Sequence, residues 1–386
     1  MPDPSALQVI HVVARDSPRA RLELARDLRS RTDIAPHQSV LHVGLGKTAI
    51  DMRPSVHVGG LLKLGRSSTE SLDAALKRHS PTVLHVWSEL ALAWVVPVVA
   101  AMSGYPDLSR EQLPSVVLDC DSIRSGKRIA WVREELDESA SFVCNSQRFW
   151  QHTRAAGAPE ESVAVIRDGV DFAAINEARA RVNRGALDIP KSARVIAILP
   201  PIERAAGSFL AGWAALLVDR MRSDLVVLVP GSGREMERVR RIFAASHRSA
   251  MLFLPGDQMS LAEVLAIADL ALFLPPRDES TTSLASAMAS GVPIVATATP
   301  AVTELLSHCA NAFLAQPDSP KDAARRIMEA LDNGEQCRTH VELARTQAFA
   351  AFSRQRMFEQ YARLYKNLAT DEPAIAGIDD PVFAGV

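Results

Sequence analysis

The sequence predicts an α/β protein with two doubly wound domains in tandem. The chain has 386 residues, of which 47% are hydrophobic, and this is enough to fill two ordinary cores. Short runs rich in β-branched residues alternate with longer helical patterns, which is typical of parallel sheets built from βαβ units. The alternation breaks once, at the polar stretch 176–193, and we place a linker there.

The first half of the chain contains six predicted strands. Between the first two, residues 17–31 (SPRARLELARDLRSR) form an amphipathic pattern with Leu22, Leu24, Ala25 and Leu28 on its apolar side. The longest apolar run, residues 90–102 (LALAWVVPVVAAM), is too short to span a bilayer and favours a buried helix. The six strands are expected at residues 7–13, 39–44, 82–87, 115–120, 141–145 and 162–166.

A second series of strands follows the linker, with helical stretches such as residues 261–268 between them. These strands are expected at residues 194–199, 224–231, 250–256, 270–276 and 292–297. We therefore expect a first domain at 1–175, a linker at 176–193 and a second domain at 194–355. A C-terminal helix at 356–370 is expected to cross back to the first domain. The acidic tail 371–386 carries Pro and Gly and is expected to be disordered.

Composition argues against several classes of protein. The 43 basic residues nearly balance the 45 acidic ones, so no overall field attracts nucleic acid. The basic run 238–241 is typical of a solvated helix face. The four cysteines are scattered without a CxxC pair, so neither a zinc site nor a disulfide framework is predicted. The N-terminal stretch lacks the pattern of a signal peptide, and we expect a cytoplasmic protein with at most peripheral membrane association.

Residues 43–51 (VGLGKTAID) look at first like a phosphate-binding loop of a nucleoside triphosphatase. That loop needs a glycine five positions before Gly46, and this position is Leu41, inside a predicted strand. Without that glycine the backbone amides cannot wrap a phosphate. The sequence therefore argues against a nucleoside triphosphatase.

Residues 275–297 (PPRDESTTSLASAMASGVPIVAT) predict a short helix with clear ends. Ser280 or Thr281 can cap its start, and the alanines that follow favour helix. Gly291 suits a left-handed C-terminal cap, and Pro293 prevents the helix from continuing. The free amides and dipole at the amino end of such a helix can bind a diphosphate.

Three stretches, taken in order, resemble one known family. Residues 141–175 (SFVCNSQRFWQHTRAAGAPEESVAVIRDGVDFAAI) resemble its strand, helix and "NGVD" turn. Residues 227–242 (VLVPGSGREMERVRRI) with 251–276 (MLFLPGDQMSLAEVLAIADLALFLPP) are similar to its central run, and residues 275–297 resemble its "EAmA.G.PvV" helix. The family is the GT-B-fold glycosyltransferases of the retaining, family-4 type, and the resemblance covers about residues 140–365. It implies two Rossmann-like domains facing a central cleft, a nucleotide-sugar donor on the second domain, and no metal or other cofactor.

The resemblance also assigns site residues, several of them substituted. The acidic residue that contacts the donor sugar aligns with Asp278, with Glu279 beside it, and the one that binds the ribose aligns with Ser286. A serine cannot offer two charged acceptors to the ribose hydroxyls. The arginine and lysine that neutralise the leaving diphosphate align with Pro201 and Ala206.

Other residues are candidates to fill these roles. Arg204 lies between the two substituted positions and is a candidate replacement with a different reach. Arg277 and Arg234 follow strands of the second domain and are further candidate phosphate partners, but a solvated surface charge is at least as good an interpretation of these two. The expected phosphate-binding set also contains Gly207, Ser280, Thr281, Thr282 and Ser286. In the first domain the family's histidine aligns with Asp121, which joins Asp278 and Glu279 as a candidate catalytic residue. The family's Asn at the turn is Asp168.

Two functions of different classes remain open at this point. The first is a glycosyltransferase that moves a sugar from a nucleotide-sugar to a glycan or small-molecule acceptor with retention. The second is a non-catalytic protein with a degenerate donor site, acting as a partner subunit, a regulator or a ligand-binding protein. A sugar-phosphate isomerase or epimerase is disfavoured, because that chemistry needs several acid/base groups and only Asp278 and Glu279 are close together in sequence.

Overall fold

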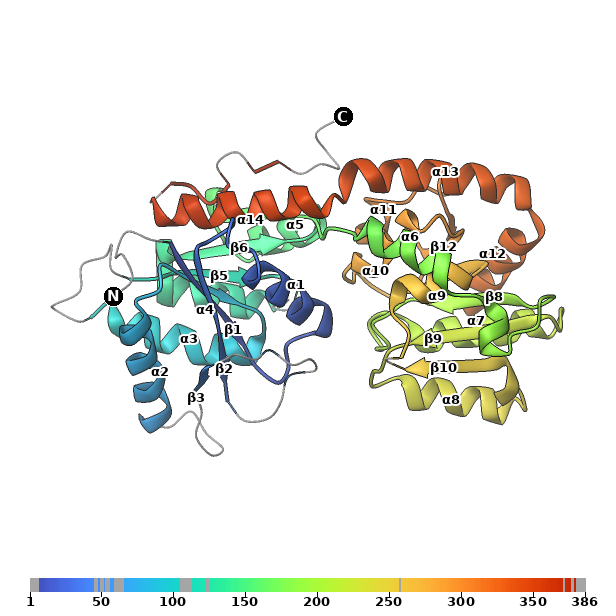
Figure 1. The fold of residues 1–386 in the computed structure, drawn as a ribbon, viewed down its shortest axis with the longest axis horizontal. Helices are drawn as coiled ribbons and strands as arrows, with labels where there is room; N and C mark the ends of the chain where they lie inside the picture. Colours follow the sequence, from blue (N-terminus) through green and yellow to red (C-terminus); the bar gives the residue numbers. More distant parts are fainter. Residues whose placement is uncertain are drawn as a thin grey trace. The chain divides into compact units, whose positions relative to one another are not determined.

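The alternation of strands and helices forms two separate parallel sheets in the computed structural model (Figure 1). The structure describes residues 7–44, 48, 52, 56–58, 66–104, 113–121, 125–256, 258–370, 372–375 and 378–379. The chain divides into a first unit of Met1–Arg167 with Gln355–Asp380 and a second unit of Asp168–Arg354 with Pro381–Val386. Each unit carries one sheet with helices on both faces, so the predicted pair of doubly wound domains is confirmed.

The first sheet has the strand order β3-β2-β1-β4-β5-β6-β7, with every neighbouring pair parallel. Its strands are β1 (Gln8–Val13), β2 (His37–Val43), β3 (Val56–Val58), β4 (Val83–Val86), β5 (Ser115–Asp119), β6 (Ala140–Cys144) and β7 (Val163–Val165). Its helices are α1 (Arg19–Arg29), α2 (Arg66–His79), α3 (Glu89–Met102), α4 (Gly126–Leu136), α5 (Gln147–Ala155) and α14 (Arg354–Ala369), with short 3-10 turns at Asp137–Ser139 and Glu160–Ser162.

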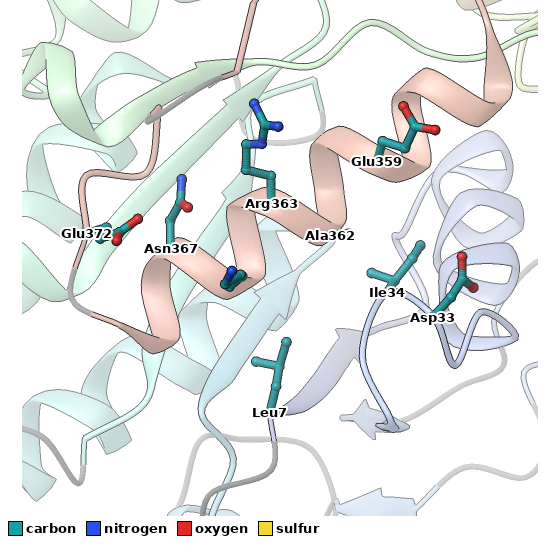
Figure 2. Close-up of a pocket in the computed structure, with 9 residues that line it drawn as sticks. Leu7, Asp33, Ile34, Glu359, Ala362, Arg363, Asn367 and Glu372 are labelled. Carbon is teal, nitrogen blue, oxygen red and sulfur yellow. The ribbon is translucent and has the colours of Figure 1, made fainter.

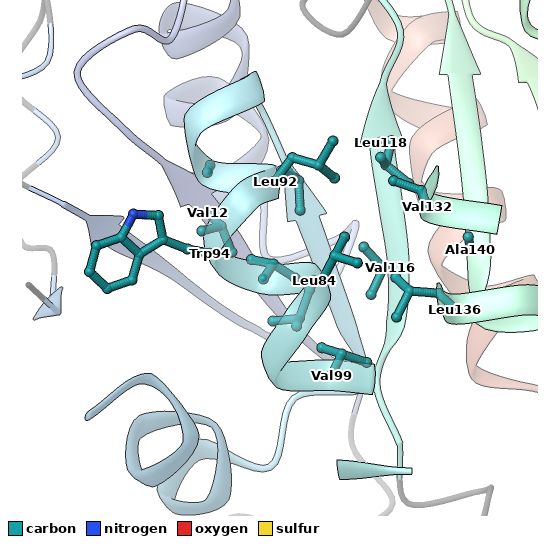
Figure 3. Packing of buried hydrophobic residues seen from close by; sticks show 14 of the residues in the cluster. Val12, Leu84, Leu92, Trp94, Val99, Val116, Leu118, Val132, Leu136 and Ala140 are labelled. Atoms are coloured by element: carbon teal, nitrogen blue, oxygen red, sulfur yellow. The ribbon is translucent and has the colours of Figure 1, made fainter. Parts of the chain in front are cut away.

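Side chains alternate between the two faces of this sheet, as the period of a strand requires. Val12, Leu84 and Val116 pack against α3 and α4 on one face, shown in Figure 3. Val9 and Val83 point to the other face, where α1 and α14 cover them. The predicted amphipathic helix is α1, with its four apolar positions buried, and the longest apolar run forms α3, capped by the Ser88 hydroxyl.

Helix α14 belongs to the core of the first unit although it lies at the far end of the chain. It buries five side chains on the sheet face that α1 also covers: Met357, Phe358, Tyr361, Leu364 and Tyr365. The tail was expected to be disordered over 371–386. Its described residues instead make contacts with α14, because Asn367 Nδ2 donates to Pro373 O (3.2 Å) and Ala374 is buried. The remaining tail residues lie outside the described part of the chain.

The second sheet repeats the same order, β10-β9-β8-β11-β12-β13, and is also fully parallel. Its strands are β8 (Arg194–Ile198), β9 (Leu225–Pro230), β10 (Leu252–Gly256), β11 (Leu270–Phe273), β12 (Ile294–Thr297) and β13 (Phe313–Ala315). Helices α7 (Ser208–Asp219), α8 (Met236–Ala245) and α12 (Pro320–Asp332) cover one face. The other face carries α6 (Phe172–Arg181), α9 (Leu261–Ile267), α10 (Thr282–Ala289) and α13 (Gly334–Ala351). Shorter pieces are α11 (Pro300–Thr303) and 3-10 turns at Arg184–Leu187 and Ser249–Met251.

The stretch expected to be a linker is part of the second unit. Residues 176–181 complete α6, and a 3-10 turn follows at Arg184–Leu187. The chain enters the second unit at Asp168 and leaves it at Arg354, and these two passages lie side by side. Val170 N donates to Phe352 O at 2.9 Å, and Val170 forms a parallel bridge with Ser353. A Cβ on Gly169 would lie 2.4 Å from Arg354 Cα, so this close passage requires glycine.

Candidate functional site

The second sheet has its topological switch point between β8 and β11. The strands connect outward in opposite directions from this pair, and ligands of doubly wound proteins bind beyond the carboxyl ends of such strands. Leu199 N donates to Leu272 O (2.9 Å), which extends the pairing of these strands to the start of the loop that follows β8. The loops after β8 and β11 contain most of the residues that the sequence singled out.

Glycines let the backbone of these loops pack closely. Gly207 has φ +72°, and a Cβ there would lie 1.6 Å from Leu274 O, at the end of β11. A Cβ on Gly233, after β9, would lie 2.1 Å from Ile202 O. Arg234 N and Glu235 N also donate to the loop after β8, the first to Glu203 Oε1 and the second to Ile202 O, both at 3.2 Å. The loops after β8, β9 and β11 therefore form one connected edge.

Helices α7 and α10 begin at this edge without a side-chain cap, and so does α8, which Glu235 precedes. Six other helices of the described chain have a capping Ser, Asp or Asn side chain, such as Ser260 before α9. Helices α1, α4 and α11 also lack such a cap. The first-turn amides of α7 and α10 point to this edge, where an anion would accept hydrogen bonds and be favoured by the helix dipoles.

Three arginines stand on the same edge. Arg204 follows β8, Arg234 follows β9 and Arg277 follows β11, which are neighbouring strands. All three side chains are exposed, and among the described residues none forms an ion pair. Unpaired guanidinium groups over two helix starts suit a phosphate or diphosphate group.

Asp278 and Glu279 lie in the loop after β11, and both accept hydrogen bonds from backbone amides. Asp278 Oδ1 accepts a hydrogen bond from Ala301 N (2.9 Å), which ties the loop after β11 to the start of α11. Glu279 is only 3% exposed, and its Oε1 accepts from Ser280 N at 3.0 Å. Both carboxylates thus hold the loop in place, and Asp278 is the more accessible of the two.

The hydroxyl groups at the start of α10 form a small network. Ser280 Oγ and Thr282 Oγ1 are 3.0 Å apart, and the Thr282 hydroxyl donates to Asp168 Oδ2. Thr281 is buried. The Ser283 hydroxyl is buried as well and has no hydrogen-bond partner among the described residues. This unsatisfied donor at the second residue of α10 is a feature that the sequence did not indicate.

Ser286, Pro201 and Ala206 are the second-domain positions at which the resemblance indicated substitutions. Ser286 donates its hydroxyl to Thr282 O (3.3 Å), one turn back along α10. Pro201 is exposed, whereas Ala206 is 3% exposed and packs in the core beneath the loop. A hydroxyl turned to its own helix gives the ribose of a nucleotide no charged acceptor.

The segment that enters the second unit holds α10 at both ends, which the sequence did not predict. Asp168 accepts from Thr282 at the first residue of α10, and the Arg179 guanidinium donates to Ser290 O at the carboxyl end. Negative charge near the amino end and positive charge near the carboxyl end both stabilise a helix dipole. The pattern "NGVD" located Asp168, but only the structure shows what it contacts.

In the first unit, Asp121 is held by a buried cation. Arg21, in the first turn of α1, donates to Asp121 Oδ2 and lies 3.5 Å from Asp119 Oδ2. All three residues are at most 5% exposed. A buried arginine between two carboxylates fixes α1 to the end of β5. The position expected to contact a sugar therefore carries an ion-paired aspartate.

Two surface hollows lie away from these residues. A groove of about 590 Å³ in the first unit is lined by α14 and by the turn after α1, with Asp33, Glu359 and Arg363 on its rim (Figure 2). A hollow of about 290 Å³ in the second unit lies beside the paired passages, against Phe172 and Phe349. Among the described residues, no group of three or more His, Cys, Asp or Glu side chains could hold a metal ion. No helix within that part of the chain is long and apolar enough to cross a membrane.

Comparison with known proteins gives a family match within the second unit. The family model described as "Glycosyl transferases group 1" matches residues 182–347. The chain is 26% identical over 149 residues to N-acetyl-alpha-D-glucosaminyl L-malate synthase of Bacillus anthracis, which is 39% of each protein. It is 28% identical over 254 residues to D-inositol 3-phosphate glycosyltransferase of Jonesia denitrificans, covering 62% of this chain and 58% of that one. The matched part of the chain thus spans between about two fifths and three fifths of the length of these two relatives.

Solved structures show the same fold at low sequence identity. Anabaena HepE in complex with UDP-glucose superposes with a TM-score of 0.74 at 16% identity, covering 94% of this chain and 100% of that one. A glycosyltransferase from Rickettsia africae ESF-5 has a TM-score of 0.73 at 14% identity, covering 95% of this chain and 100% of that one. Both similarities cover the two domains together.

Proposed function

We propose that this chain is a working GT-B glycosyltransferase, on the premise of its group 1 domain at residues 182–347. In this proposal it transfers a sugar from a nucleotide-sugar donor to an acceptor hydroxyl, and the configuration at the anomeric carbon is retained. In that reaction the bond between the anomeric carbon and a diphosphate oxygen breaks. The acceptor oxygen bonds to the same face of that carbon, its proton passes to the departing diphosphate oxygen, and the nucleoside diphosphate leaves.

One observation carries the proposal. Three unpaired arginines and the uncapped starts of α7 and α10 lie on one edge of the second sheet, at its switch point. Negative charge grows on the leaving diphosphate in the transition state, so donors fixed there in advance lower the barrier. In this proposal Arg204, Arg277 and Arg234 supply the positive charge that Pro201 and Ala206 do not. No divalent cation is required.

The loop after β11, which carries Asp278 and Glu279, binds the donor sugar in the proposal. Asp278, the more accessible carboxylate, contacts a hydroxyl group of the donor sugar, and its bond from Ala301 N fixes its orientation. The buried Glu279 supports the loop through its bond from Ser280 N. The hydroxyls of Ser280, Thr281 and Thr282 and the amides of the first turn bind the phosphates. Ser286 contacts the ribose only through a neutral hydroxyl.

The experiment that tests this proposal is calorimetric titration with UDP, then GDP and ADP, because HepE is described in complex with UDP-glucose. We expect micromolar binding of one nucleotide, weakened at least about tenfold by Arg204→Ala or Arg277→Ala. Arg220→Ala removes another exposed arginine, at the opposite end of α7, and is the matched control. No binding of any nucleotide at millimolar concentration would overturn the proposal. Unchanged affinity in 1 mM EDTA is expected if no cation takes part.

A second candidate function is a non-catalytic binding protein on the same fold. The observations that favour it are the ion-paired Asp121 and the inward-turned Ser286 hydroxyl. An assay of nucleoside diphosphate release from the bound nucleotide-sugar distinguishes the two candidate functions. Release above the uncatalysed rate in the presence of an acceptor panel supports the transferase, and tight binding without release supports the second candidate.

A further inference from the structure

The loop after β11 begins with two consecutive prolines, Pro275 and Pro276. Proline has no backbone N–H, so neither residue can donate a hydrogen bond to a neighbouring strand, and the pairing of β11 ends there. Pro275 is buried, and its carbonyl oxygen still needs a donor. A side chain supplies this donor: the Thr297 hydroxyl, at the last residue of β12, donates to Pro275 O at 2.5 Å.

Thr297 connects three neighbouring strands at the carboxyl edge of the sheet. It lies one residue beyond the last pair of β11 and β12, which is Phe273 with Ala296. Its backbone is paired with Ala315 of β13, and its side chain reaches the loop after β11 on the other side. The hydroxyl therefore continues the connection between β12 and β11 past the point where the prolines end the backbone pairing.

A second hydrogen bond joins the same two loops further on. Ala301 N, in α11, donates to Asp278 Oδ1 at 2.9 Å. The segment 297–301 thus holds the loop after β11 at two points, Pro275 and Asp278. A carboxylate offers several acceptor sites, so Asp278 can accept from Ala301 N and also bind a ligand hydroxyl.

The phosphate side of the proposed donor site is held by different contacts. Thr282, the first residue of α10, donates its hydroxyl to Asp168 Oδ2, and Ser280 Oγ lies 3.0 Å from Thr282 Oγ1. These bonds do not involve the segment 297–301. A change at Thr297 is therefore expected to act on the part of the loop that carries Asp278 and to leave the start of α10 in place.

We propose that Thr297 is a positioning residue for the sugar end of the donor. Its hydroxyl fixes the start of the loop after β11 and so places Asp278 against a hydroxyl group of the sugar. The inference rests on the proposed function, because it takes Asp278 as the residue that binds the sugar of a nucleotide-sugar. It gives β12, which carries none of the site residues expected from the sequence, a part in sugar recognition.

Calorimetric titration of Thr297→Val tests the proposal, because valine keeps the branched shape of threonine and removes the hydroxyl. The probes are UDP, GDP and ADP, each compared with its glucose conjugate. We expect the affinity for the glucose conjugate to fall about fivefold, and the affinity for the nucleoside diphosphate itself to change by less than about twofold. Thr297→Ser keeps a hydroxyl and is expected to restore both affinities.

An Asp278→Ala background shows whether Thr297 acts through Asp278. In that background, Thr297→Val is expected to cause no further loss of affinity for the glucose conjugate, since the contact that Thr297 orients is already absent. Thr153→Val is the matched control. Thr153 is also fully buried, lies in the first unit, and has its hydroxyl oxygen 3.5 Å from Cys144 Sγ. Its replacement is expected to leave all affinities unchanged.

Hydrogen exchange gives a second measurement, which needs no ligand. In Thr297→Val the Ala301 amide is expected to exchange about tenfold faster, because the loop that carries its acceptor is no longer fixed at Pro275. The amides of β6, in the first unit, are expected to exchange at the rate of the unaltered chain.

The possible outcomes separate this inference from the proposed function. If Thr297→Val leaves the affinity for the conjugate unchanged, or weakens the nucleoside diphosphate and its conjugate equally, the inference is wrong and the proposed function stands. The same conclusion follows if the loss persists in the Asp278→Ala background or if the Ala301 amide exchanges at its original rate. If the unaltered chain binds none of these compounds at millimolar concentration, the proposed function and this inference are both wrong.

Discussion

The Nδ1 atom of His85 lies 2.7 Å from the hydroxyl oxygen of Tyr365, a residue 280 positions later in the chain. Both side chains are fully buried, and the His85 ring also stacks on Trp87 at 3.8 Å. This hydrogen bond joins the middle strand of the first sheet to α14. The last helix is thus held to the first domain by a polar contact as well as by apolar packing.

Replacement of Tyr365 by Phe is expected to destabilise the first domain by about 1–3 kcal/mol, since it leaves His85 Nδ1 buried without its partner. Urea unfolding followed by tryptophan fluorescence measures this, because four of the five tryptophans lie in the first unit. His85→Leu and the double variant complete a mutant cycle. If the two single effects are additive, the hydrogen bond contributes nothing and the interpretation is wrong.

Acid is expected to destabilise the first domain through His11. Burial lowers the pKa of His11 to about 4. Trp87 Nε1 donates to its Nδ1 (3.2 Å), and its Nε2 is 3.0 Å from Gln38 Oε1, so the neutral ring is the form that fits. The unfolded chain binds the proton near pH 6.5 and the folded chain only near pH 4, so stability falls as pH falls between these values.

The expected loss from His11 over that range is about 3 kcal/mol. Urea unfolding at intervals from pH 4.5 to 7.5 measures the slope, and His11→Gln should lower the number of protons taken up on unfolding by up to one. Burial also holds the pKa of His85 well below its usual value, so some pH dependence remains in the variant. If the free energy of unfolding has the same pH dependence in the wild-type chain and in His11→Gln, the prediction is wrong.

Gly207→Ala is expected to destabilise the second domain by more than about 3 kcal/mol, because its Cβ would overlap Leu274 O. Gly231→Ala is the matched control. Gly231 has nearly the same φ, +74° against +72°, but a Cβ there meets no atom within 4 Å. The control should cost only about 1 kcal/mol, the cost of the backbone conformation. Hydrogen exchange of the β8 and β11 amides measures the loss of stability in each variant. Equal losses in the two variants would show that the backbone conformation alone determines them.

Asp168→Asn is expected to raise the affinity for a nucleoside diphosphate about fivefold. The Asp168 carboxylate accepts from the Thr282 hydroxyl at the start of α10, so it places a negative charge near the proposed phosphate site. The amide keeps an acceptor oxygen and removes the charge. Calorimetry at 0.1 M and 0.5 M salt tests this, and the advantage of the variant should shrink at the higher salt. Weaker binding by Asp168→Asn at both salt concentrations would show that the carboxylate assists the ligand.

Most strands could be predicted because they are short apolar runs rich in β-branched residues and flanked by turns. The two strands that the sequence did not indicate, β3 and β13, have three residues each. Strand β7 is as short, but the apolar run around it extends to Ile166 and made it recognisable. The linker was placed over the second half of α6 because residues 176–181 (NEARAR) are mostly polar and only Ala178 among them is buried. Composition cannot distinguish such a helix from a connecting segment.

The candidate site was predictable in position but not in its contacts. The resemblance located α10 and the loop after β8 through glycine and alanine spacing. The contacts of Asp121 with Arg21 and of Asp168 with Thr282 join residues 100 and 114 positions apart, and no local pattern encodes such pairs.

The two adjacent passages at Gly169 and Arg354 have a consequence for the order in which the protein forms during translation. The first domain begins to emerge from the ribosome before the second, yet α14, which supplies Met357, Phe358 and Tyr361 to its core, emerges after the second domain is complete. A growing chain therefore carries an apolar sheet face that only α1 covers through the synthesis of about half its length. The domain that is translated first is the one that finishes folding last.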